Sequence, residues 1–127
     1  MIVTARLTIP GEPRAKQRPR VTRHGTYTPK ITRDYETSIR NIWDAADRPE
    51  KPVCVRLDVT FYLGTKRHVD ADNLVKCVKD ALNGRAYMDD WQVHEVRAHK
   101  YYTTKDRART EVTVYSINPD RQETRSC

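Results

Sequence analysis

The segment that most constrains the fold is a ten-residue run in which apolar and polar side chains alternate strictly. The apolar positions are Val53, Val55, Leu57, Val59 and Phe61, and mostly polar residues stand between them. Successive side chains of a β-strand point to opposite faces, so a period of two predicts a strand with one face against a core. The chain is therefore expected to build a sheet and to cover its apolar face.

Three further strands are expected on either side of this run. Residues 2–9 alternate in the same way before Pro10-Gly11 ends the pattern. Residues 92–102 and 109–117 are also rich in side chains that favour strands, and the polar segment 103–108 separates them. Because these two runs are close in sequence, we predict that they form an antiparallel hairpin.

Two other segments have the period of an amphipathic helix. The first begins after Thr32, which we expect to cap it, and its apolar stripe consists of Tyr35, Ile39, Ile42, Trp43 and Ala46. Trp43 belongs to this stripe, so we expect it in the core and not stacked on a base. The second helix spans about residues 72–83, and its stripe consists of Leu74, Val78, Ala81 and Leu82.

These elements predict one α+β domain of order β-α-β-α-β-β, with a mixed sheet and two helices packed against it. A chain of 127 residues is long enough for a single domain and too short for two. We assign residues 1–117 to the domain, including a long basic loop at 10–33, and expect residues 118–127 to form a polar flexible tail. Only 37% of the residues are hydrophobic, so a homodimer interface would help to stabilise the fold.

The net charge of +7 is concentrated near the N-terminus. Residues 1–33 contain eight Lys or Arg against the single acid Glu12, whereas the rest of the chain has sixteen charges of each sign. Segregated positive charge is typical of a segment that follows a phosphate backbone, although a basic loop that serves only solubility would look the same. The candidate DNA-binding residues are Arg14, Lys16, Arg18, Arg20, Arg23 and Lys30.

Acidic residues gather at both ends of the second predicted helix. Asp70 and Asp72 lie at its start, and Asp89-Asp90 follow its end. Lys76 stands four residues after Asp72, on the same face of the helix, where it can stabilise charge on a phosphate. Carboxylates without a His or Cys cluster favour Mg²⁺, with Mn²⁺ as the second choice.

Each acidic residue also has an ordinary structural interpretation. Asp70 or Asp72 can cap the helix, and Asp89-Asp90 can form a solvent-facing turn. Asp80, which lies near Lys76 on the helix, is expected to make a surface ion pair of small value. The residues as a group, together with Lys76 and the basic loop, favour a metal site.

The combined motifs resemble the RusA family of Holliday-junction resolvases, which are small homodimeric Mg²⁺-dependent endonucleases of phages and prophages. The matching segments are Val69-Asp70-Ala71-Asp72-Asn73-Leu74 with Lys76, Asp80-Ala81-Leu82, and Met88-Asp89-Asp90-Trp91-Gln92-Val93. Order and gaps fit along about residues 53–117. Two N-terminal segments also resemble the phage members, Lys16-Gln17-Arg18-Pro19-Arg20 and Tyr27-Thr28-Pro29.

The resemblance implies a role for individual residues. Asp70, Asp72 and Asp90 would be the catalytic carboxylates that bind the metal, and Lys76 would be a catalytic or phosphate-contacting lysine. Asp89 would be an adjacent supporting residue and not a ligand. Asn73 is a supporting residue by its position, where it can bond the helix N-terminus or a phosphate, and we expect the structural role.

The resulting hypothesis is a Mg²⁺-dependent endodeoxyribonuclease that acts as a homodimer on four-way DNA junctions and cuts two strands symmetrically. Two alternatives stay open at this point: a non-catalytic nucleic-acid-binding module, and a nuclease for other branched or single-stranded DNA. The sequence has no N-terminal segment like a signal peptide and no apolar run of membrane-spanning length. We therefore expect a cytoplasmic protein with no membrane partner.

Overall fold

A computed structural model of the chain describes residues 1–45 and 54–117. Ala46, Val53 and the predicted tail at 118–127 lie outside these ranges. Within them, neither helix is long and apolar enough to cross a membrane.

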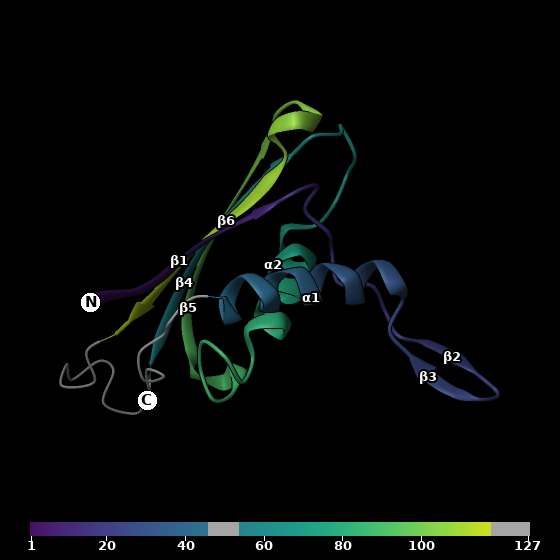
Figure 1. The fold of residues 1–127 in the computed structure, drawn as a ribbon, viewed down its shortest axis with the longest axis horizontal. Helices are drawn as coiled ribbons and strands as arrows, with labels where there is room; N and C mark the ends of the chain where they lie inside the picture. Colours follow the sequence, from purple (N-terminus) through teal and green to yellow (C-terminus); the bar gives the residue numbers. More distant parts are fainter. Residues whose placement is uncertain (46–53, 118–127) are drawn as a thin grey trace.

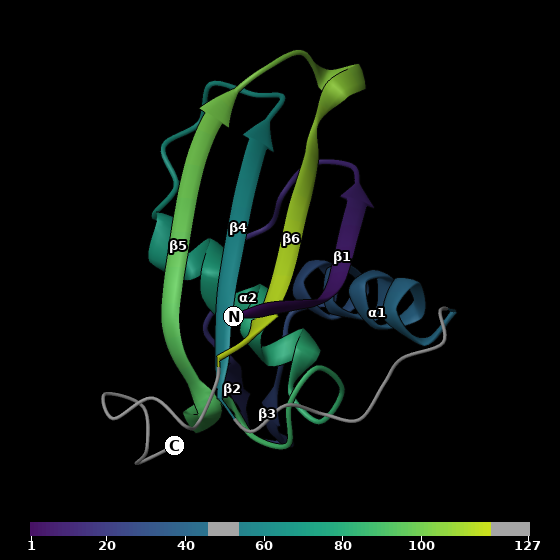
Figure 2. The ribbon, with the colours of Figure 1, turned by 90° about the vertical axis from the view of Figure 1, so that its left-hand side faces the viewer.

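The core of the fold is a four-stranded mixed sheet with the strand order β1-β6-β4-β5 (Figure 2). The strands are β1 Ile2–Pro10, β4 Val55–Leu63, β5 Val93–Tyr102 and β6 Arg109–Ser116. β6 pairs antiparallel with both β1 and β4, whereas β5 pairs parallel with β4. The predicted α+β class and mixed sheet are confirmed.

The predicted hairpin between the last two strands is wrong, because β4 lies between β5 and β6. The connection crosses the end of β4, where the Thr103 amide donates to the Leu63 carbonyl at 2.7 Å, and it contains the short 3-10 helix η2, Lys105–Arg107. The inward side chains of β4, from Val55 to Leu63, are at most 1% exposed. A strand whose inward side chains are so completely covered lies inside the sheet. β4 therefore pairs with both β5 and β6 and keeps these two strands from pairing with each other.

Both helices lie on the same face of the sheet (Figure 1). They are α1 Lys30–Asp44 and α2 Ala71–Leu82. Of the predicted stripe on α1, Tyr35, Ile39 and Trp43 are buried and Ile42 is partly buried against the core. Trp43 is therefore a core residue, as predicted. The hydroxyl groups of Tyr35 and Thr110 lie 2.6 Å apart and join α1 to β6.

The start of α1 differs from the prediction. The helix begins at Lys30, and Pro29 with φ −54° occupies the N-cap position that we expected for Thr32. Thr32 is instead fully buried, and its hydroxyl accepts a hydrogen bond from the Gln17 amide at 3.4 Å. Thr32 thus lies inside the helix and binds the segment that contains Gln17. Local capping rules cannot anticipate this contact, because they consider only the helix itself.

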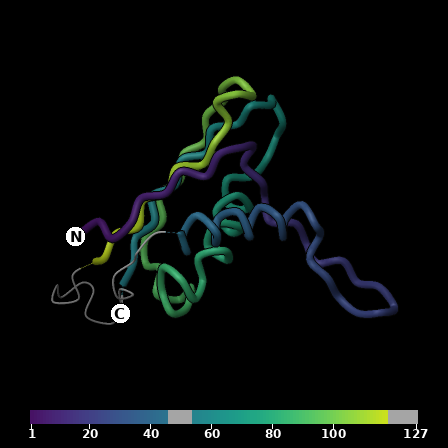
Figure 3. The backbone as a smooth tube through the Cα atoms, viewed as in Figure 1, coloured from purple at the N-terminus to yellow at the C-terminus, as the bar shows by residue number. Residues whose placement is uncertain are grey.

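The predicted basic loop contains a small antiparallel hairpin, formed by β2 Arg20–Thr22 and β3 Gly25–Tyr27. Gly25 has φ 121°, a value that residues with a side chain rarely adopt, and the Thr22 hydroxyl closes the turn with bonds to the His24 amide and the Gly25 carbonyl. Every residue of the two strands is exposed. The hairpin extends away from the sheet and helices (Figures 1 and 3).

Candidate active site

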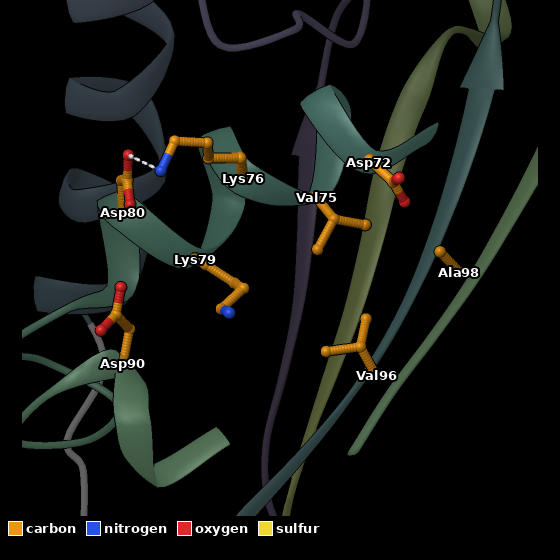
Figure 4. A pocket seen from close by; sticks show the side chains of 8 residues that line it. All are labelled: Asp72, Val75, Lys76, Lys79, Asp80, Asp90, Val96 and Ala98. Atoms are coloured by element: carbon orange, nitrogen blue, oxygen red, sulfur yellow. Dashed lines mark ion pairs between the residues drawn. The ribbon is translucent and has the colours of Figure 1, made fainter. Parts of the chain in front are cut away.

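A pocket of about 400 Å³ lies where α2, β5 and the short 3-10 helix η1, Asp90–Gln92, come together (Figure 4). It is lined by Asp72, Val75, Lys76, Lys79, Asp80, Asp90, Val96 and Ala98. Three carboxylates and two lysines therefore share one cavity with a few apolar side chains. Three of the residues singled out by the sequence, Asp72, Lys76 and Asp90, lie together in this pocket.

The first turn of α2 supplies Asp72, and the next turn supplies Lys76. Asp70 occupies the N-cap position of this helix, with the extended backbone typical of a cap, but its side chain makes no capping hydrogen bond. Within the described ranges, the carboxylates of Asp70 and Asp72 make no hydrogen bond or ion pair. The capping interpretation therefore does not account for either side chain.

Asp89 and Asp90, which look equivalent in the sequence, have different surroundings. The Asp89 side chain accepts a hydrogen bond from the Asp90 amide at 2.7 Å, and the Gln92 side chain accepts from the Asp89 amide at 3.1 Å. This reciprocal capping box holds the start of η1. Asp89 is thus occupied within its own turn, while the Asp90 side chain lines the pocket.

The described chain does not gather the three predicted metal ligands. Among residues 1–45 and 54–117, no group of three or more His, Cys, Asp or Glu side chains lies close enough to hold one ion. Asp72 and Asp90 line the same pocket but lie toward opposite ends of it in Figure 4, and Asp70 is not a lining residue. The assignment of all three as ligands stays a prediction.

The structure adds Asp80 to the site, a residue for which we expected only a surface ion pair. Its side chain is 25% exposed, and its Oδ2 atom lies 3.9 Å from Lys76 Nζ and 3.1 Å from Lys16 Nζ. Figure 4 shows the contact with Lys76. The spacing of Asp80 and Lys76 on one helix face revealed part of this arrangement, but no local pattern links Asp80 to Lys16.

Lys16, predicted to contact DNA, is occupied inside the protein. Its ammonium lies 3.0 and 3.2 Å from the two carboxylate oxygens of Glu36 as well as 3.1 Å from Asp80. Burial lowers the pKa of Lys16, but the hydrogen bonds with Glu36 and Asp80 together raise it by more than burial lowers it. The pKa of Lys16 is therefore above its ordinary value.

The other predicted DNA-binding residues differ in their exposure and in whether they form ion pairs. Arg18, Arg20 and Arg23 are exposed, on or beside the hairpin, and none of them makes an ion pair with any described residue. Lys30 is exposed but pairs with Asp34 at 2.7 Å, and Arg14 is partly buried. Among the predicted set, the three arginines are therefore exposed positive charges without an ion pair to any described residue.

Fold and site together define a small α+β protein with carboxylates and lysines in one pocket and a basic hairpin projecting from the same domain, an arrangement typical of nucleases. Comparison with known families identifies which one. Residues 10–115 match the family described as Endodeoxyribonuclease RusA, and the chain therefore belongs to this family. The resemblance inferred from the motifs is confirmed, and the non-catalytic alternative loses its support.

One curated relative shares part of the sequence. It is "Uncharacterized protein YqaN" of Bacillus subtilis (strain 168), which is 43% identical over 49 residues. The matched stretch covers 39% of this chain and 33% of the relative, so the likeness concerns about a third of that protein's length.

Proposed function

We propose that this protein is a Mg²⁺-dependent, structure-selective endodeoxyribonuclease that resolves four-way DNA junctions by paired, symmetric strand cleavage. The pocket carries the proposal, because it places Asp72, Lys76 and Asp90 together in a chain of the RusA endodeoxyribonuclease family. Nucleases of this family depend on divalent metal ions and act on branched DNA junctions. The preference for Mg²⁺ follows from the donor set, which consists of hard carboxylate oxygens.

The proposed chemistry is hydrolysis of a phosphodiester. Water adds to phosphorus, one P–O ester bond breaks, and the products are a phosphate monoester and a free hydroxyl group. Negative charge grows on the phosphate oxygens during this step. The Lys76 side chain is 62% exposed, and its ammonium is the group at the pocket that would stabilise this charge. Asp70, Asp72 and Asp90 are the proposed ligands of Mg²⁺, with Asn73 and Asp89 in support. Since the described chain does not gather these carboxylates, we assign no step to the ion.

The hairpin supplies the proposed DNA contacts. Arg18, Arg20 and Arg23 present free guanidinium groups to solvent, and no acidic residue occurs between Glu12 and Asp34. A two-stranded ribbon is narrow enough to enter a DNA groove. The hairpin would therefore hold the phosphate backbone while the pocket lies at the scissile bond.

We also propose that the enzyme is a homodimer, located in the cytoplasm with its DNA substrate. β5 is the last strand of the sheet, so one of its edges has no strand partner within the described ranges, and such an edge is a template for pairing with another chain. Large apolar side chains are exposed beside it, Met88 at 67%, Trp91 at 63% and Val96 at 41%. Two copies related by a two-fold axis would match the symmetry of paired cuts.

Sedimentation equilibrium of the protein should give about twice the chain mass of 14.9 kDa.

The test compares a synthetic four-way junction with a linear duplex and a flap of the same sequence, each with Mg²⁺ and with EDTA. We expect symmetric nicks in the junction with Mg²⁺, and no cleavage with EDTA. Equal cutting of all three substrates would contradict junction selectivity, and a preference for the flap would assign the enzyme to other branched DNA. Cleavage that survives EDTA would contradict metal dependence.

A further inference from the structure

Lys16 attaches the basic loop at 10–33 to both helices. The Lys16 amide donates to the Asn73 carbonyl at 2.9 Å, inside the acidic motif at the start of α2. The ammonium of the same residue contacts Glu36 on α1 and Asp80 on α2. One residue thus joins the segment that leads to the hairpin with both helices and with a carboxylate of the pocket.

The ammonium of Lys16 has no donor left for DNA. A lysine offers three N–H donors, and the three carboxylate oxygens of Glu36 and Asp80 within 3.2 Å are enough to occupy them. The side chain is also only 18% exposed. A role in phosphate binding, suggested by its place in the basic loop, would require these contacts to break.

Asp80 lies between two lysines that it does not hold equally. Lys16 is nearer, at 3.1 Å, and largely buried, whereas Lys76 is at 3.9 Å and 62% exposed. The shorter and less hydrated ion pair is the stronger one. Asp80 is therefore neutralised mainly by Lys16, and Lys76 is held only loosely.

We infer that Lys16 is a positioning residue for the reaction: by binding Asp80, it keeps the Lys76 ammonium available for the DNA phosphate. This inference rests on the proposed function of Lys76. Without Lys16, the Asp80 carboxylate would draw Lys76 into a close i,i+4 ion pair and reduce its charge toward the substrate. The structure thus assigns Lys16 and Asp80 to the site together.

The experiment removes the positive charge and then the carboxylate that it holds. Lys16→Met alone would leave the buried Glu36 carboxylate without its partner, so the first variant is Lys16→Met with Glu36→Gln. The second adds Asp80→Asn. We expect the first variant to cleave the junction tenfold or more slowly at saturating substrate, and the second to recover most of that loss. Thermal unfolding of both variants checks that each is folded.

Two further measurements distinguish the mechanism from the alternatives. Modification of Lys76 by an amine-reactive reagent, followed by peptide mass spectrometry, should slow in the first variant and return in the second. The slope of log affinity against log salt should be that of the unmodified protein in the second variant, where Lys76 is available again. A slope shallower by about one in both variants would make Lys16 a phosphate contact and overturn the inference. Unchanged Lys76 reactivity in the first variant, or no recovery on adding Asp80→Asn, would also overturn it.

Lys76→Met serves as the control for the proposed function itself. Its cleavage rate should fall below that of every Lys16 variant. If Lys76→Met still cut the junction normally, the proposed role of Lys76 would be wrong, whereas the reactivity of Lys76 would still decide whether Lys16 controls it through Asp80.

Discussion

At the scale of single residues, the pocket owes its charge pattern to how each carboxylate is engaged. Asp80 is neutralised mainly by Lys16, and Asp89 is tied to its own turn. Asp72 and Asp90 line the cavity with no ion pair to any described residue. Free carboxylates at a site for a polyanion repel it unless a cation is present, so these two are the best candidates to require a metal.

Asp72→Asn should abolish cleavage and leave junction binding unchanged or tighter. The substitution removes a proposed ligand charge, and it also removes repulsion of phosphate. Cleavage is measured with Mg²⁺, and binding by gel shift with Ca²⁺ in its place. Asp106→Asn, an exposed acid in η2, is the matched control and should change neither. Retained cleavage in Asp72→Asn would return Asp72 to a structural role at the start of α2.

Asp90→Asn should lose about as much activity as Asp72→Asn, and Asp89→Asn should be milder. Loss of a supporting acid typically reduces activity by tenfold to about a hundredfold. Because the side-chain oxygen of Asn can accept the Asp90 amide as Asp89 does, Asp89→Asn should leave stability nearly unchanged. Both variants are assayed at saturating Mg²⁺ and near half-saturation. Greater damage from Asp89→Asn at both concentrations would move the proposed ligand from Asp90 to Asp89.

At the scale of elements, the hairpin β2–β3 and the helix α2 divide the proposed work. The hairpin is fully exposed and carries free arginines, while α2 is packed on the sheet and presents Asp72 and Lys76 to the pocket. Lys16 lies in the short segment between Pro13 and the hairpin and anchors it to α2. The arm that would bind DNA is therefore attached beside the residues that would cut it.

Changing Arg18 and Arg20 together to Ala should weaken binding of junction and duplex DNA alike. For each phosphate contact that is lost, DNA binding releases about one counterion fewer. The slope of log affinity against log salt should therefore become shallower by roughly two. The control with the same loss of charge is Lys105 and Arg107 changed to Ala in η2, between β5 and β6 and away from the hairpin (Figure 1). An unchanged slope in the hairpin variant would show that these arginines are solvated bystanders.

At the scale of the whole molecule, the four-stranded sheet holds both helices on one face and leaves the other face to polar and aromatic side chains. On that open face, Tyr62 stacks with Tyr101 at 5.8 Å between ring centroids, and the Arg109 guanidinium lies 3.9 Å from the centre of the Tyr62 ring. The covered face carries the main core, which includes the thiol of Cys77 at 0% exposure. The stability of the fold is therefore sensitive to ionisation of groups in this core.

The free energy of unfolding should fall as the pH rises above about 9, in part because of Cys77. Burial raises the pKa of this thiol to about 12, so the folded protein keeps its proton while the unfolded chain releases it. Stability is then lost at up to about 1.4 kcal/mol per pH unit. Cys77→Ala should lower stability overall but flatten this dependence between pH 8 and 10, as measured by denaturant unfolding. Identical slopes with and without Cys77 would contradict the prediction.

The sequence by itself determined the four long strands and both helices, although not the small hairpin β2–β3. Alternation in β4 and the apolar stripes of α1 and α2 are local patterns, because the periods of strands and helices act over neighbouring residues. The same is true of Asp72 and Lys76, whose spacing places them on one helix face. Motif order along the chain was sufficient to indicate the family, which the match over residues 10–115 confirms.

Only the tertiary structure decided how distant segments meet. β4 lies between β5 and β6, because which strand occupies the buried centre of the sheet depends on the packing of all strands together. Residue type and spacing left Asp89 and Asp90 equivalent, and the turn that η1 makes gives them different surroundings. Lys16 changed from a presumed DNA contact to a partner of Asp80 because α1, α2 and the N-terminal segment converge at its ammonium. Contacts of this kind join residues that are far apart in the sequence, and the periods of strands and helices relate only neighbouring residues.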